Sequence, residues 1–112
     1  MRKILGLVLM AALPLGLTPT AMANNPQIIR AKVKIVNFAF KPATLNIAQG
    51  TKVIWKNTTT TTSHTSTSDT NVWDSGVIAP GTKFARKFGK VGTFTYHCSI
   101  HPTMKGTVNV SA

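Results

Sequence analysis

The sequence predicts an all-β domain, an antiparallel sandwich or barrel, and three observations support this prediction. Basic and apolar residues alternate with a period of two along several short segments. Gly- and Pro-containing turns separate these segments at near-regular intervals, and no stretch carries an apolar stripe of helical period. Short alternating strands joined by such turns are typical of antiparallel sandwiches and barrels.

Residues 1–23 have the features of a cleaved export signal. Arg2-Lys3 precedes an apolar run from Ile4 to Leu17, and Ala21-Met22-Ala23 has the small-residue pattern of a cleavage site. The run is too short for a permanent membrane span, and no cysteine lies at the cleavage site to carry a lipid. We therefore expect a periplasmic mature chain of residues 24–112 that forms a single domain and has no stable membrane anchor.

The first half of the mature chain contains three predicted strands. In Arg30 to Ile35 the basic residues alternate with apolar ones, which gives one wet face and one buried face. The second strand contains Leu45 and Ile47 and ends at the turn signal Gln49-Gly50. The third, Thr51 to Lys56, repeats the alternation with Val and Trp inward and Lys outward. The threonine run 58–62 that follows is expected to be a loop or a strand edge.

The second half contains three more predicted strands. The turn Ala79-Pro80-Gly81 precedes a strand from Phe84 to Phe88. A Gly-containing turn leads from there into Thr93 to Cys98, and Gly106 to Val110 is the last strand, with two valines on one face.

The charge balance is strongly basic. Of 13 Lys and Arg residues, 11 remain after Arg2 and Lys3 are removed, against Asp69 and Asp74, so that the mature chain carries a formal charge of +9. Such a field favours acidic partners. Nucleic acid is not expected, because the chain is exported and its lysines alternate along strands instead of clustering with aromatic residues.

The segment YHCSIHPTM, residues 96–104, carries three metal-ligand types in a C-x-x-H-x-x-M spacing. Alternation places Cys98 on the inward face, and Pro102 ends the strand ladder, so that a tight loop brings the thiol of Cys98, the imidazole of His101 and the thioether of Met104 together. Soft sulfur donors with imidazole suit copper. With His64 as a second imidazole, the set is that of an electron-transfer copper site.

Cys98 allows three other interpretations. It is the only cysteine, so an intrachain disulfide is excluded, but it could be a buried apolar residue. A cysteine nucleophile paired with a histidine would need a substrate cleft, for which the small domain leaves little room. Zinc would accept His64, Cys98 and His101, yet methionine is a poor zinc ligand. Copper accounts for the whole set best.

Beyond the ligand spacing, nearly all of the mature chain resembles the cupredoxins, the small blue copper proteins, and within them the plastocyanin and amicyanin type. FAFKPATLNIAQGTKVIWKN is similar to the opening sheet of the family, SHTSTSDTNVWDSGVIAPGTKFARKF to the segment with the first histidine ligand, and GTFTYHCSIHPTMKGTVNV to the segment with the other three. The short loop matches the amicyanin type. The resemblance implies an antiparallel Greek-key β-sandwich of about eight strands, with one type 1 copper ion bound by His64, Cys98, His101 and Met104.

The resemblance also implies function: a monomeric electron carrier without enzymatic activity that cycles between Cu(I) and Cu(II). Copper delivery or storage is the alternative. Acidic redox proteins are the expected partners, with Lys105 beside the ligand loop. Near the site, backbone N–H groups of the loop are expected to bond to the Cys98 thiolate, and Asn57 and Thr65 are expected to lie close to the ligands. His101 is the expected electron port, and its coordination to the reduced copper is expected to be lost on acidification. His97 is expected to be uninvolved.

Overall fold

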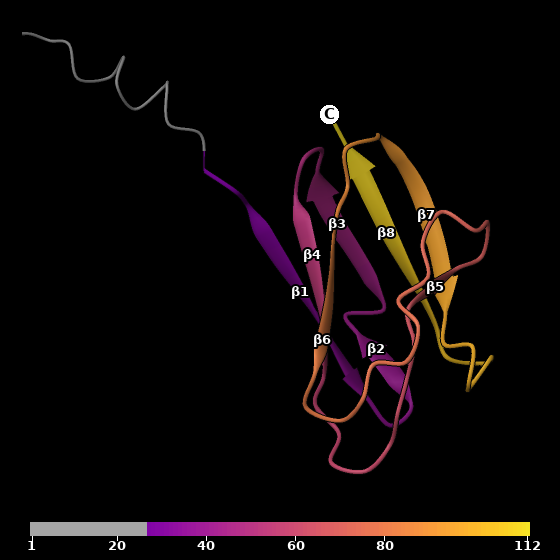
Figure 1. The fold of residues 1–112 in the computed structure, drawn as a ribbon. Helices are drawn as coiled ribbons and strands as arrows, with labels where there is room; N and C mark the ends of the chain where they lie inside the picture. The colour runs from indigo at the N-terminus through magenta and orange to yellow at the C-terminus, as the bar shows by residue number, and fades with distance from the viewer. Residues whose placement is uncertain (1–26) are drawn as a thin grey trace, which may run out of the picture.

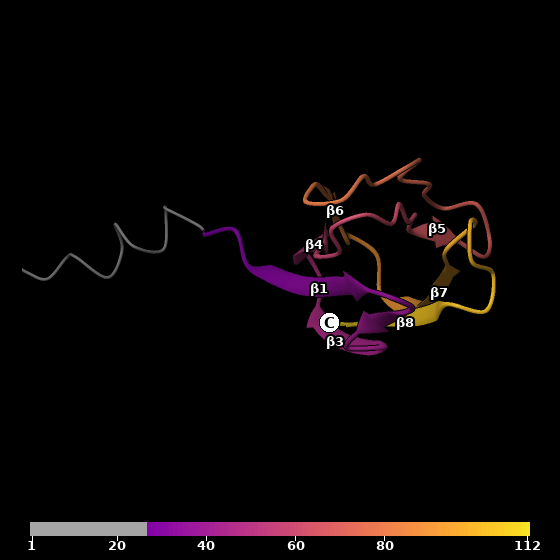
Figure 2. The same cartoon turned by 90° about the horizontal axis from the view of Figure 1, so that it is seen from below.

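A computed structural model describes residues 27–112, so the predicted signal segment 1–23 lies outside the described residues. Eight strands form two four-stranded sheets that pack against each other (Figures 1 and 2). One sheet has the order β2-β1-β4-β6, formed by Ala39–Lys41, Arg30–Val36, Lys52–Asn57 and Lys83–Lys87. The other has the order β3-β8-β7-β5, formed by Thr44–Ala48, Lys105–Ser111, Gly92–His97 and Thr67–Ser68. No helix among residues 27–112 could cross a membrane.

The predicted all-β sandwich is confirmed, and each of the six predicted strands corresponds to an observed one. The two shortest strands, β2 and β5, were not predicted. The sheets are mixed and not wholly antiparallel, because β1 runs parallel to β4 and β3 runs parallel to β8. Between β1 and β4 the chain crosses to the other sheet as β3, so β4 enters in the direction of β1 and not as its hairpin partner.

The core consists of the residues that alternation directs inward from both sheets. Val33, Ile35, Val53 and Trp55 from the first sheet are fully buried, with 0% exposure. Trp73, which lies in the connection after β5, is also buried, and its ring is 5.9 Å from that of Trp55. Aromatic residues from both layers therefore meet at the centre, where each buried side chain contributes about 1.5–3 kcal/mol.

Tyr96 on β7 links this core to the end of the sheet that carries Cys98. Its ring is 1% exposed and lies over Gly106, the residue directly opposite on β8. A Cβ atom on Gly106 would be 2.7 Å from Tyr96 Cε1, and closer still to Cζ and the hydroxyl, so only glycine fits. Burial raises the pKa of the Tyr96 phenol to about 12.

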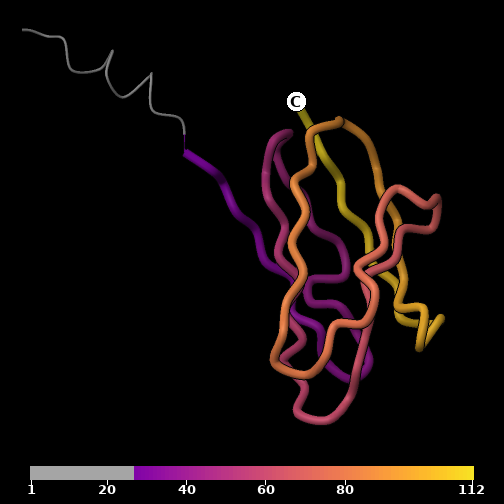
Figure 3. Tube along the Cα trace, viewed as in Figure 1, coloured from indigo at the N-terminus to yellow at the C-terminus, as the bar shows by residue number. Residues whose placement is uncertain are grey.

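The segments that carry the predicted ligands gather at one end of the sandwich. The chain leaves β4 into the threonine run, which is a loop, and β7 ends in the loop that returns as β8. Figure 3 shows both loops, together with the turn after β1, at the end opposite the C-terminus. The fold thus places residues about 34 positions apart at a common edge.

Candidate metal centre

Cys98 and His101 are held by a tight backbone loop. The N–H of His101 donates to the carbonyl of Cys98 (3.2 Å) and the N–H of Met104 to that of His101 (2.9 Å). The loop closes where the N–H of Cys98 donates to the carbonyl of Met104 (3.0 Å). Cys98 is fully buried and His101 half-buried. Two successive tight turns therefore fold the C-x-x-H-x-x-M segment back on itself.

His64 lies in the connection between β4 and β5 and is fixed by Ile78. The two residues exchange backbone hydrogen bonds of 3.2 and 2.7 Å as an isolated bridge. The imidazole is fully buried. A histidine 34 residues before Cys98 is thereby brought to the same end of the sandwich.

The donor atoms of His64, Cys98 and His101 converge. Nδ1 of His64 lies 3.8 Å from Sγ of Cys98, Nδ1 of His101 lies 3.6 Å from it, and the three donor atoms are all within 4.8 Å of one another. For metal bonds of about 2.0 Å to nitrogen and 2.3 Å to sulfur, an angle of 120° separates the two donors by about 3.7 Å. The observed distances fit a trigonal ion, and two imidazoles with one thiolate suit copper.

Met104, the fourth predicted ligand, lies at the base of the ligand loop. It is 2% exposed, and its backbone bonds to both Cys98 and His101 as described above. Its thioether is therefore enclosed in the same end of the domain as the three converging donors. Its role as the weak axial ligand stays a prediction.

Thr65 joins the two halves of the site. Its backbone N–H donates to Sγ of Cys98 (3.3 Å), and its hydroxyl oxygen accepts from the N–H of Ser99 (2.8 Å). We expected the sulfur to be bonded by N–H groups of the loop that carries His101. The donor that the structure shows comes instead from the segment after His64, so one residue positions both the sulfur and the start of the ligand loop.

Asn57, the other residue expected near the ligands, acts at one remove. Its amide donates to the carbonyl oxygens of Thr62 and Ile78, each at 2.8 Å. Its carbonyl accepts from the N–H and the hydroxyl of Thr59 (3.0 and 2.6 Å). Because Ile78 pairs with His64, these bonds fix the segment that supports the ligand and the loop that precedes it.

Asn37 contacts the site and was not found by sequence reasoning. Nε2 of His64 donates to Oδ1 of Asn37 at 2.8 Å, which leaves Nδ1 without a proton and facing Cys98. No local motif identifies Asn37, since it lies 27 residues before its partner. A polar residue directly after a predicted strand was the only available signal.

Phe38 covers the two imidazoles from outside and was also missed. Its ring is 4.9 Å from that of His101 and 6.1 Å from that of His64, edge to face in both cases. Phe38 is 61% exposed, although it is a large apolar side chain. An exposed aromatic ring therefore lies at the surface beside His101.

The electrostatics favour a neutral ligand at His64 and leave His97 outside the group. Burial, and secondarily the imidazole of His101, lower the pKa of His64, and a metal ligand must be unprotonated.

His97 points to the outer face, where its Nδ1 lies 2.6 Å from Oδ1 of Asp69. This hydrogen bond, and then one with Thr95, lower the pKa of Asp69. The pair was not predicted.

A β-sandwich that presents two imidazoles and one thiolate, positioned for one copper ion, defines a small copper protein. The family model described as a cupredoxin-like domain matches residues 6–110, and the chain belongs to the cupredoxin-like family. The fold and the His–Cys–His group together support a blue copper electron-transfer protein. No match to the chain was found among curated protein sequences.

Solved structures show the same fold. A purple cupredoxin from Nitrosopumilus maritimus is 29% identical (TM-score 0.66), over 72% of this chain and 99% of that one. The Cu(I) form of an amicyanin variant is 23% identical (TM-score 0.69), over 80% and 89%, a likeness that concerns the fold alone. A copper-containing nitrite reductase from Thermus scotoductus is 27% identical (TM-score 0.69) over 79% of this chain, which spans only 23% of the reductase chain.

Proposed function

We propose that this protein is a periplasmic type 1 copper protein that carries single electrons between redox partners and has no enzymatic activity of its own. The observation that carries the proposal is the convergence of three donor atoms: two imidazole nitrogens lie 3.8 and 3.6 Å from one buried thiol sulfur, a spacing that fits a trigonal ion. His64, Cys98 and His101 would hold the ion, with Met104 as the axial ligand. Bound copper supplies the one-electron Cu(I)/Cu(II) couple.

The surrounding residues would keep the ligand geometry the same in both oxidation states. Asn37 selects the ligating nitrogen of His64, and Thr65 bonds to the sulfur while tying Ser99 to the histidine segment. Both contacts arise between separate parts of the chain, so the ligands do not move independently. Ligands that are held in place lower the structural rearrangement that accompanies electron transfer.

We propose His101 as the electron port and acidic redox proteins as the partners of a monomeric carrier. His101 is the more exposed of the two imidazoles and packs against the exposed ring of Phe38, so that a partner can approach closely there. Lys105, exposed at the start of β8, lies across from His97 near this loop. Raising the ionic strength should slow electron exchange with an acidic partner, since surface attraction is screened.

The test is to add Cu(II) to the mature protein and record its absorption spectrum. An intense blue or purple colour is expected, and it should be lost in Cys98→Ser and strongly altered in His64→Gln and His101→Gln. His97→Gln is the matched control: an adjacent imidazole is removed, and the colour should remain. A colourless copper complex in the unmodified protein would contradict the proposal.

Copper delivery or storage, the alternative function, makes a different kinetic prediction. A carrier of copper ions should release Cu(I) to a chelator quickly, whereas an electron carrier should exchange electrons quickly and release copper slowly. The burial of His64 and Cys98 supports the second behaviour. Release to a chelator that is faster than electron self-exchange would favour delivery.

A further inference from the structure

The outer faces of the two sheets differ in chemistry. On the sheet β3-β8-β7-β5 two of the outward rows are neutral. In one of them Asn46, Asn109 and Thr93 lie side by side and are joined by side-chain hydrogen bonds of 3.0 Å. The neighbouring row is made of Thr44, Thr107 and Thr95. These two rows therefore form without charge, and Lys105, opposite His97 at the metal end, is the one Lys or Arg on the strands of this sheet.

The outer face of the sheet β2-β1-β4-β6 is almost entirely cationic. The strand register sets Lys34 beside Lys41 on one side and Lys56 on the other, and Lys83 continues this row. Two residues along the strands, Lys32 heads a row with Ile54 and Ala85, and a third row follows. We call the surface of these rows the basic face; its cations are Arg30, Lys32, Lys34, Lys41, Lys52, Lys56, Lys83 and Lys87.

The arrangement costs stability within the protein. Like charges directly opposite each other on neighbouring strands repel. Neither of the two acidic residues of the mature chain, Asp69 and Asp74, belongs to these strands, so no ion pair offsets the repulsion. Eight of the 11 basic residues of the mature chain share this face, at strand spacings of about 4.8 Å and alternate-residue spacings of about 6.7 Å. A polyanion would remove the repulsion that the fold leaves in place.

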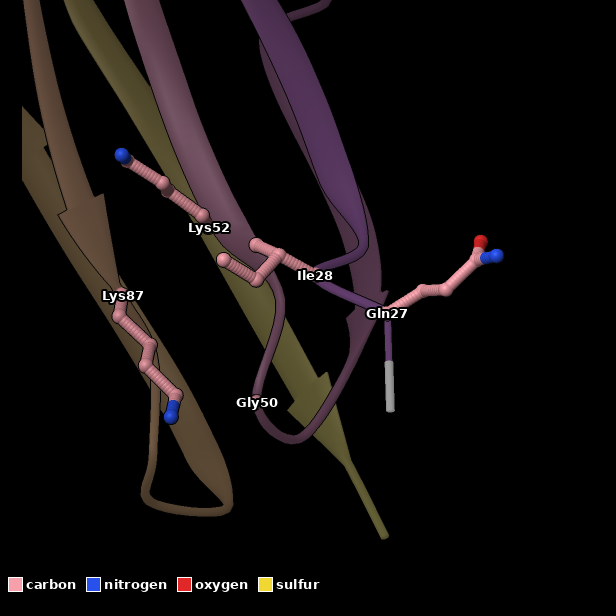
Figure 4. A pocket seen from close by; sticks show the side chains of 5 residues that line it. All are labelled: Gln27, Ile28, Gly50, Lys52 and Lys87. Atoms are coloured by element: carbon pink, nitrogen blue, oxygen red, sulfur yellow. The ribbon is translucent and has the colours of Figure 1, made fainter. Parts of the chain in front are cut away.

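An exposed apolar side chain lies at the edge of the basic face. Ile28 is 62% exposed and lines a shallow hollow with Lys52, Lys87 and Gly50. In Figure 4 it points to the side on which the two lysines lie, whereas Gln27 points away. Ile29, the next residue, is 63% exposed. Apolar groups beside clustered cations are typical of surfaces that rest in a membrane interface.

We propose that the basic face docks reversibly on an anionic phospholipid bilayer. The charge spans the sheet from the row at the metal end to the row of Arg30, Lys52 and Lys87, about 13 Å along the strands, so that its far row lies at the end of the sheet away from His101. Seven of the eight cations are lysines, which protein interfaces tend to lack and lipid surfaces attract. The face has no aromatic side chain on which nucleic-acid bases could stack.

Docking by this face leaves the metal centre accessible. The ligands lie at the end of the sandwich, beyond Asn57, and not on the face that the lipid would cover. In the bound protein, the surface around His101 and Phe38 would face sideways, along the membrane plane. Encounters with a membrane-associated redox partner would then take place in two dimensions.

The test measures binding of the mature protein to vesicles by flotation. Mixed phosphatidylcholine and phosphatidylglycerol vesicles should bind it and pure phosphatidylcholine vesicles should not. Lys34→Gln/Lys56→Gln, in the longest row, should lower the partition coefficient about 30-fold. Lys90→Gln/Lys105→Gln removes the same charge away from the basic face and should lower it by about threefold or less.

Two further measurements complete the test. The Lys34→Gln/Lys56→Gln variant should melt at the same or a higher temperature, because repulsion is relieved, and should keep its copper colour, which separates this proposal from that of the copper site. Equal losses in the two double variants, or equal binding to neutral vesicles, would overturn the proposal. So would displacement from the vesicles by polyglutamate or by double-stranded DNA at equal charge concentration, which would assign the face to an acidic protein or to nucleic acid.

Discussion

The hydrogen bond from His64 to Asn37 yields the sharpest prediction about the site. In Asn37→Ala, Nε2 of His64 loses the acceptor that lies 2.8 Å away, and His64 itself has no exposed surface. An unsatisfied buried donor costs about 1–3 kcal/mol, and 1 kcal/mol corresponds to about 4–8 °C in the Tm of a domain of this size. The imidazole also loses the contact that selects its tautomer, for which a 10–100-fold loss of metal affinity is typical, or about 1.4–2.8 kcal/mol.

The assay combines thermal melting of the copper-free protein with a competition titration of copper against a chelator of known affinity. Thr62→Val is the matched control, because Nδ2 of Asn37 donates to the Thr62 hydroxyl at 3.3 Å and this change leaves the bond to His64 intact. Asn37→Asp retains an acceptor and should recover most of the affinity. If Asn37→Ala binds copper as tightly as Thr62→Val, the tautomer of His64 does not depend on Asn37 and the argument fails.

Two further outcomes are expected. Gly106→Ala should destabilise the protein by about 3 kcal/mol in denaturant unfolding, because its Cβ would overlap the buried Tyr96 ring; a loss below about 0.5 kcal/mol would contradict this close packing. Asp69→Asn should cost well under 1 kcal/mol at neutral pH, since the pair with His97 is exposed. Because the pKa of Asp69 is lowered, this contribution is fully present above about pH 4 and is lost as the pH falls through the pKa of the folded protein, so the difference between the two proteins should shrink on acidification.

The strands and the three converging donors could be predicted because each depends on a local pattern. Alternation of period two is visible within six residues, and the spacing of Cys98, His101 and Met104 needs only one loop. Even the distant His64 could be chosen, since the chain has three histidines and one of them, His97, is directed outward by alternation. The residue types that bind copper are few, which narrows the search further.

The contacts around those donors could not be predicted, because they depend on which strands become neighbours. Asn37 reaches His64 only because β1 runs parallel to β4, and the pairing of β1 with β4 leaves no signature in either strand. Likewise Asp69 meets His97 through the two-residue strand β5, which is too short to show a period. Side chains such as Phe38 that cover a site have the composition of any exposed loop residue.

Strand register connects the basic face to the metal centre. Val33 pairs with Trp55 and Ile35 with Asn57, and a slip of one residue would turn the buried side chains outward and place lysines in the core. The register that buries Val33 therefore also directs Lys34 outward and sets the end of β1 beside the end of β4. Because Asn37 follows the end of β1 and Asn57 ends β4, the same alternation that forms the core sets both asparagines at the metal end of the sandwich and the cations on the outer face of the sheet.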